Sequence, residues 1–241
     1  MATMNQYTDI TDYYDLLVTQ GYYNYQGMAE AVYSVMQGRE KVLDLGVGTG
    51  LLAEELLKLA PECEFTGVDI TASMLEIARE RLGENVKLVE ADVIKMDLQE
   101  TFDMAISSGG VWIISQRGDK NNLGTHGGDI ELHLQGLINL AKHIRQDGLV
   151  LLNLQADQAN KETNLPDGIV YSQEVKKISE DEENELIEKS YFFKRNGEIL
   201  AQQHLILGFI KEWKKEELME KAGFAFVGAD QNQKFHIYKR I

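Results

Sequence analysis

A short apolar strand that runs directly into a glycine-rich turn constrains the fold of this chain more than any other feature. Residues 41–45 form the expected strand, and the turn at 46–50 reads GVGTG. Such a strand–turn–helix unit is typical of open α/β sheets, which bind ligands beyond the carboxyl ends of their strands. Short apolar runs then alternate with segments of helical periodicity, as expected for parallel β-α-β units.

Further elements follow in a regular order. We expect strands at 65–69, 86–90, 103–107 and 149–154, and helices at 51–60, between Thr71 as N-cap and Gly83, and at 130–144. Between 169 and 209 polar and apolar residues alternate, which predicts an antiparallel meander of strands 170–178, 186–194 and 198–209. Asn196-Gly197 is a strong hairpin turn sequence within it. A helix at 214–221 and strands at 224–228 and 235–238 close the chain.

The glycine turn differs from the dinucleotide-binding fingerprint. That fingerprint requires a third glycine where this chain has Leu51, whereas here the third glycine is Gly50 and the pattern is D-x-G-x-G-x-G beginning at Asp44. A carboxylate at this place repels a pyrophosphate and suits an ammonium group. An NAD-dependent oxidoreductase is therefore a disfavoured alternative.

Two more acids follow the next strands. Asp69 ends the second strand, where a carboxylate can accept both hydroxyls of a ribose. Asp92 follows the third strand and is placed to accept from an adenine amine, with Ile70 and Val93 as apolar surfaces for the ring. Three acids at three successive strand ends thus match an ammonium, a ribose and an adenine.

This set of residues resembles the class I S-adenosylmethionine-dependent methyltransferase family, over residues 41–241. The resemblance implies S-adenosylmethionine as cofactor and an α/β fold with a Rossmann-like, seven-stranded, mostly parallel sheet and helices on both faces. The antiparallel meander and an N-terminal helical lid over the acceptor pocket would be additions to that sheet. The expected cofactor-binding residues are Asp44, Gly46, Gly48, Gly50, Asp69, Ile70, Met74, Asp92, Val93, Ser107 and Ser108.

We expect a single methyltransferase domain over 1–241, with a lid at 1–38, a cofactor-binding core at 39–155, the meander insertion at 165–210 and a closing helix and hairpin at 211–241. The meander resembles the insertion of small-molecule methyltransferases, so the resemblance implies methyl transfer to an oxygen or nitrogen of a small molecule, such as a specialised metabolite. A protein or peptide methyltransferase and a non-catalytic S-adenosylmethionine-binding subunit are the alternatives within this fold.

Residues for the acceptor are expected in three regions. Residues 109–128 read as a long polar loop beside the acceptor, and a loop of this length in a compact domain is more often functional than idle. Three histidines are candidate bases, namely His126, His133 and His204. Four aromatic residues are candidate pocket walls, namely Tyr14, Tyr22, Tyr25 and Trp112.

Charge and composition exclude other classes of function. The formal net charge of −15 disfavours a nucleic-acid partner, because binding to a phosphate backbone needs a basic face. The single cysteine, Cys63, excludes an internal disulfide. The first residues have neither a basic start nor an apolar run, and no apolar stretch is long enough for a membrane span, so we expect a cytoplasmic protein without a membrane partner. We expect no metal, and either a monomer or a homodimer.

Overall fold

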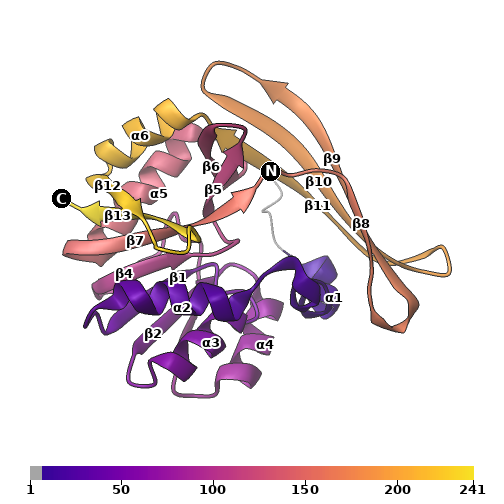
Figure 1. Ribbon diagram of the computed structural model, residues 1–241, viewed down its shortest axis with the longest axis horizontal. Coiled ribbons are helices and arrows are strands. Elements are labelled where there is room, and N and C mark those ends of the chain that lie inside the picture. Colours follow the sequence, from indigo (N-terminus) through magenta and orange to yellow (C-terminus); the bar gives the residue numbers. More distant parts are fainter. Residues whose placement is uncertain (1–6) are drawn as a thin grey trace.

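A mostly parallel sheet forms the centre of the computed structural model, which describes residues 7–241 (Figure 1). Its strands lie in the order β3-β2-β1-β4-β7-β13-β12, in which the first five pair in parallel, β13 runs antiparallel to β7, and β12 runs antiparallel to β13. This is the expected seven-stranded sheet, and the predicted fold class is confirmed. The strands are β1 (Lys41–Leu45), β2 (Glu64–Asp69), β3 (Lys87–Glu90), β4 (Phe102–Ser107), β7 (Ile144–Ala156), β12 (Phe224–Ala229) and β13 (Phe235–Arg240).

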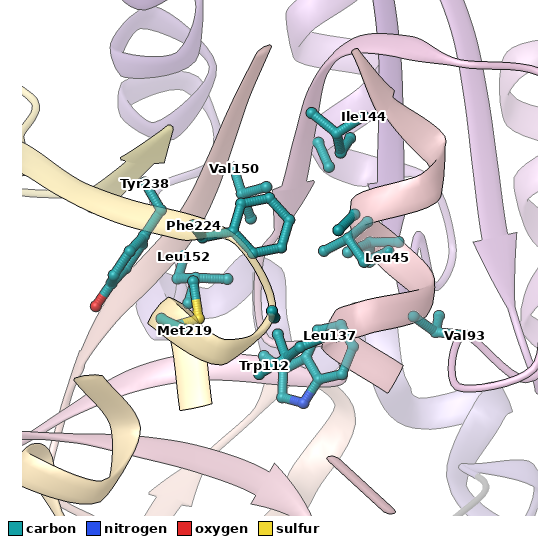
Figure 2. Close-up of a cluster of buried hydrophobic side chains, with 14 of the residues drawn as sticks. Leu45, Val93, Trp112, Leu137, Ile144, Val150, Leu152, Met219, Phe224 and Tyr238 are labelled. Atoms are coloured by element: carbon teal, nitrogen blue, oxygen red, sulfur yellow. The ribbon is translucent and has the colours of Figure 1, made fainter. Parts of the chain in front are cut away.

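Helices cover both faces of this sheet, so successive residues of its central strands are buried on both faces. One face carries α2, α3 and α4 and the other carries α5 and α6 (Figure 1). Figure 2 shows the second face, where Leu45, Val150 and Leu152 of the sheet meet Leu137 of α5 and Phe224 at the start of β12. The helices are α2 (Tyr25–Met36), α3 (Leu51–Leu59), α4 (Ala72–Leu82), α5 (Ile130–His143) and α6 (Glu212–Lys221).

The prediction of a polar loop at 109–128 is wrong for most of these residues. It is a hairpin of β5 (Trp112–Arg117) and β6 (Lys120–His126), whose two-residue turn begins at Gly118 with a left-handed φ of 65°. Trp112 starts β5 and is fully buried in the core of Figure 2, so it is not a pocket wall. Its large apolar ring is stabilised there by burial against α5 rather than by a ligand.

This hairpin joins the parallel sheet to the meander. β5 pairs with the last residues of the long strand β7, and β6 pairs with β11, so the two sheets are continuous through β7. The meander strands are β8 (Lys161–Asn164), β9 (Ile169–Glu180), β10 (Asn184–Arg195) and β11 (Glu198–Ile210). Asn196 and Gly197 both have left-handed φ values, 52° and 85°, as the type I′ turn requires, so the predicted hairpin is present.

The N-terminal segment lies between the meander and the parallel core. It contains η1 (Thr8–Ile10), α1 (Thr11–Leu17) and η2 (Val18–Tyr22), while residues 1–6 of the expected lid 1–38 lie outside the described residues. Its buried apolar residues pack against the meander, on Tyr171, Phe193 and Leu205. Asp15 of α1 forms an ion pair with Arg81 of α4 on the core side. Within residues 7–241, no helix combines the length and apolar character needed to cross a bilayer.

Candidate functional site: a cleft at the strand ends and an adjoining chamber

A cleft of about 420 Å³ lies at the carboxyl ends of β1, β2 and β3, where the acids of the sequence were expected to meet. Parallel strands bring their carboxyl ends to one edge of a sheet, so residues far apart in sequence become neighbours. Most of the expected cofactor-binding residues line this cleft, namely Asp44, Gly46, Gly48, Asp69, Ile70, Met74, Asp92, Val93 and Ser108.

The glycine turn passes very close to a second backbone segment. A Cβ on Gly46 would lie 2.8 Å from the Cα atom of Gly110, and Gly46 and Gly48 have left-handed φ values of 80° and 56°. Gly50 differs from them because it does not line the cleft. It has φ 82° at the N-cap of α3, and a Cβ there would lie 2.9 Å from the Cδ1 atom of Leu82, so Gly50 serves the packing of α3 on α4.

Asp44 is a buried acid with an unpartnered oxygen. Its side chain is 2% exposed, and its Oδ1 atom has no hydrogen-bond partner among residues 7–241. Burial, and then the charge of Asp69, raise the pKa of this carboxyl to about 7. A buried oxygen without a partner is costly, and a ligand ammonium at this place would supply both a donor and a compensating charge.

Asp69 holds the glycine turn and the start of α4 through backbone bonds. Its Oδ2 atom accepts from the Gly48 N–H at 2.9 Å, and its Oδ1 atom accepts from the Thr71 N–H at 2.8 Å. Burial raises the pKa of Asp69, whereas these bonds lower it. Thr71 occupies the N-cap position of α4 as expected, but its side chain forms no capping bond. The Thr71 side chain and the Ile70 backbone also hydrogen-bond this carboxylate, which lines the cleft.

The third acid and the two serines complete the cleft edge. The Oδ1 atom of Asp92 accepts from the Ile94 N–H at 3.0 Å, which fixes the carboxylate in a tight turn after β3. Ser108 lines the cleft, but Ser107 does not. Ser107 is fully buried, and its hydroxyl accepts from the Trp112 N–H and donates to the Leu45 carbonyl. It ties β4 to β1 and to the start of β5 instead of facing a ligand.

A smaller chamber of about 60 Å³ adjoins the cleft, between the N-terminal segment and the meander. The two cavities share five lining residues, namely Tyr7, Tyr14, Gly109, Gly110 and His126. Tyr22, Tyr23 and Tyr191 also line the chamber, whereas Tyr25 lines the cleft. Burial raises the pKa of Tyr22 to about 12 and that of Tyr14 well above its usual range, so these phenols stay protonated and can donate hydrogen bonds.

His126 lies at the junction of the two cavities. Burial lowers its pKa to about 4, so the ring is neutral at neutral pH. Its Nδ1 atom is buried and has no hydrogen-bond partner within residues 7–241. The Tyr7 ring packs edge-on against the imidazole, at 5.9 Å between centroids. The residue lines both cavities, and its neutral ring has a nitrogen without a partner, which makes His126 a candidate proton acceptor.

The other two candidate histidines have different surroundings. His133 lines the cleft, but its Nδ1 atom already accepts from the Trp112 indole N–H at 3.3 Å, so it supports the core. The third candidate base, His204, does not face either cavity, so this prediction is wrong. Its face of β11 is exposed, and the His204 imidazole forms a 2.7 Å hydrogen bond with the Ser190 hydroxyl outside both cavities.

Lys189 also lines the chamber and was not among the residues expected from the sequence. Lys189 is 2% exposed, and its ammonium donates to the Gln158 side-chain oxygen at 2.7 Å and to the Tyr22 hydroxyl at 3.3 Å. The pattern that could have revealed it is the alternation in β10, where Ile187, Lys189 and Tyr191 occupy successive inward positions. A lysine in an otherwise apolar row of a strand is a candidate for a buried functional group.

Metal ligands do not gather around these cavities. In the part of the chain that the structure describes, no group of three or more His, Cys, Asp or Glu residues is arranged to hold a metal ion. The ionisable groups that line the two cavities are carboxylates, phenols, the imidazoles of His126 and His133, and the amine of Lys189.

Comparisons with known proteins agree with this geometry. Residues 42–123 match the family described as a methyltransferase domain. Malonyl-[acyl-carrier protein] O-methyltransferase of Bacillus cereus is 34% identical over 136 residues, which are 52% of this chain and 44% of that protein. The chain spans less than half the length of the sequence relatives it matches.

Solved structures match over nearly the whole chain. CalS10 of Micromonospora echinaspora, an amino pentose methyltransferase solved with S-adenosylmethionine, covers 95% of this chain and 97% of its own, with 17% identity and a TM-score of 0.68. DesVI of Streptomyces venezuelae covers 96% and 98%, with 18% identity and a TM-score of 0.67. At these identities the likeness shows the fold alone.

Proposed function

Because residues 42–123 form a methyltransferase domain and the chain has the class I S-adenosylmethionine-dependent methyltransferase fold, we propose that it transfers a methyl group from S-adenosylmethionine to an oxygen or nitrogen of a small molecule. The observation that carries this proposal is the joining of two cavities. A cleft lined by acids at three successive strand ends opens, through shared residues, into an aromatic chamber.

The cleft fits the cofactor group by group. The unpartnered carboxylate of Asp44 would hold the ammonium, and Asp69 would accept from the ribose hydroxyls. Asp92 would accept from the adenine amine, with Ile70 and Val93 on either side of the ring. When bound, S-adenosylmethionine supplies a methyl group already activated by its positive sulfur. The protein then has to orient the acceptor, exclude water and receive a proton.

His126 is the residue we propose to receive that proton. Its unpartnered Nδ1 atom would accept a hydrogen bond from the acceptor O–H or N–H, because the ring is neutral. A pKa of about 4 makes the ring a weak base, so it would take the proton from the strongly acidic oxonium that forms as an oxygen acceptor is methylated. Tyr7 and Tyr14, which line both cavities, would donate hydrogen bonds that orient the acceptor. His133 is less suited, because its Nδ1 atom is bonded to Trp112.

A small acceptor is favoured by the size and covering of the chamber. The chamber holds only about 60 Å³ between the meander and the N-terminal segment, which is anchored to the core by Asp15. Both the carboxylate of Asp44 beside the glycine turn and Leu51 in place of a glycine argue against a dinucleotide. Relatives and structural neighbours include an O-methyltransferase and an amino pentose methyltransferase, so both acceptor atoms stay within the proposal.

The deciding experiment is calorimetric titration with S-adenosylhomocysteine and, separately, with NADH. We expect micromolar binding of S-adenosylhomocysteine and none of NADH. Asp69→Asn should weaken binding at least tenfold, whereas Asp119→Asn, an acid exposed in the β5–β6 turn, should leave it unchanged. Absence of S-adenosylhomocysteine binding to the wild-type protein would overturn the proposal. A binding protein would then be screened with small acceptors for release of S-adenosylhomocysteine, and the absence of turnover would favour the non-catalytic alternative.

A further inference from the structure

The buried ammonium of Lys189 has no acid beside it. The residues that line the chamber include neither Asp nor Glu, and no ion pair among residues 7–241 involves Lys189. Lys215, which is equally buried at 1% exposure, pairs with Glu216 at 3.0 Å. Buried lysines are normally paired in this way, because an isolated ammonium loses its hydration without compensation. Lys189 therefore differs from an ordinary buried lysine, because no acid compensates its charge.

Two tyrosine rings contact the ammonium of Lys189, and a second lysine, Lys161, adds positive charge near it. The Lys189 Nζ atom lies 4.7 Å from the centroid of the Tyr191 ring, and Lys161 lies over the Tyr22 ring at 5.2 Å. Burial, and then the charge of Lys161, lower the pKa of Lys189 to about 7. The ammonium has three N–H donors and bonds two acceptors of the described chain, so one donor is left for a ligand.

The position of Lys189 places it away from the methyl donor. His126 lines both the cleft and the chamber, whereas Lys189 lines the chamber alone. Beyond the chamber lies a third cavity of about 440 Å³, which shares Tyr22, Tyr23, Gln155 and Gln158 with the chamber and is also lined by Lys161. Lys161, Lys234 and Asp157 are the charged residues that line this outer cavity, and Lys189 lines the chamber that adjoins it.

We propose that the acceptor carries an anionic group, a carboxylate or a phosphate, that binds Lys189 while the atom to be methylated lies at His126. The placement of the methylated atom at His126 rests on the proposed function, whereas the anion site at Lys189 does not. The charges of the two cavities support it: acids line the cleft that would hold a cationic cofactor, and a lysine without an acid lines the chamber. In a chain of net charge −15, an anion needs such a local cation to enter.

The test uses small anions as probes, because they separate the two possible groups. Malonate and inorganic phosphate are titrated calorimetrically at fixed ionic strength into the protein saturated with S-adenosylhomocysteine and into the free protein. Malonamide serves as the neutral counterpart. Lys189→Met retains most of the apolar stem and removes the charge. Lys194→Met is the matched control, because Lys194 lies on the same strand with its ammonium over the Phe192 ring and outside the chamber.

We expect at least one anion to bind the wild-type and Lys194→Met proteins and malonamide not to bind. Lys189→Met should weaken the binding of that anion by about tenfold or more. An unchanged affinity for S-adenosylhomocysteine would show that the variant is folded. Binding of malonate alone would identify a carboxylate, and binding of phosphate alone a phosphate. Failure of both anions to bind, or equal binding to Lys189→Met, would overturn the inference. Anion binding that depends on Lys189 in a protein that does not bind S-adenosylhomocysteine would overturn the proposed function and leave only the anion site at Lys189 standing.

Discussion

Replacing Asp44 with asparagine should stabilise the free protein and weaken its binding of the cofactor. The native fold raises the pKa of this carboxyl from 3.8 to about 7, through burial and through the charge of Asp69. The folded state therefore binds the proton more tightly than the unfolded state. Stability from this group is fully present below pH 4 and is lost as the pH rises toward 7.

The size of the stability effect follows from that difference. At about 1.4 kcal/mol per unit of pKa, the change from 3.8 to about 7 corresponds to a cost of about 4 kcal/mol for ionised Asp44 at pH 8, as an upper value. The asparagine amide in the variant would remain neutral at every pH. We expect Asp44→Asn to raise the melting temperature of the free protein at pH 8 by up to about 8–16 °C, since about 1 kcal/mol shifts a domain of this size by about 2–4 °C. At pH 4 the two proteins should melt alike.

The binding effect has the opposite sign. An ammonium at Asp44 would form a charge-assisted hydrogen bond in a buried site, and its loss is worth about 1.5–3 kcal/mol, or about tenfold to 150-fold in Kd. Wild-type affinity for S-adenosylhomocysteine should rise by up to about tenfold per pH unit from 5 toward 7, as Asp44 gives up its proton, and then level off. Asp44→Asn should show no such rise.

Calorimetry and differential scanning fluorimetry between pH 5 and 9 measure both effects. Methylthioadenosine is the control ligand, because it retains the nucleoside and lacks the ammonium, so Asp44→Asn should leave its affinity unchanged. Equal losses of affinity for both ligands would mean that the substitution distorts the whole cleft. A variant that is less stable than wild type at pH 8 would refute the conclusion that ionised Asp44 is a strained buried charge.

Three further outcomes are expected. Asp15→Asn removes the carboxylate of α1 that pairs with Arg81 and accepts from the Thr49 hydroxyl at 2.5 Å. Stopped-flow fluorescence should then show that S-adenosylhomocysteine dissociates several times faster. Because the ion pair is partly exposed, the free energy of unfolding should change by about 1 kcal/mol or less. Gly110→Ala would place a Cβ 2.3 Å from the carbonyl oxygen of Leu45, so denaturant titration should show a loss of more than about 2 kcal/mol, and near-wild-type stability would contradict the close approach. His126→Phe should lower kcat by about 100-fold with the acceptor found by screening and leave S-adenosylhomocysteine affinity within about threefold, and an unchanged kcat would exclude His126 as proton acceptor.

The sheet and most of the cleft could be predicted because their determinants are local or ordered along the chain. Apolar runs followed by helical periodicity placed β1, α3 and β2 within a residue or two of their observed bounds. The acids of the cleft follow from the same logic, since each comes directly at or after a strand end and parallel strands share that edge. The β5–β6 hairpin was missed because β6, with the sequence KNNLGTH, shows no apolar alternation. Its buried position depends on pairing with β11, more than eighty residues later.

The residues that line the chamber could not be predicted, because the sequence does not indicate which face of a meander strand is buried. On β11, the alternation that groups His204 with Ile206 is correct, yet packing against the N-terminal segment buries the opposite row, including Leu205. On β10, the same packing turns Lys189 inward together with Tyr191. Both results follow from one contact between distant parts of the chain. A strand whose inward row is otherwise apolar tolerates a lysine only where a partner compensates its charge, and in this protein the described chain supplies two hydrogen bonds and no acid.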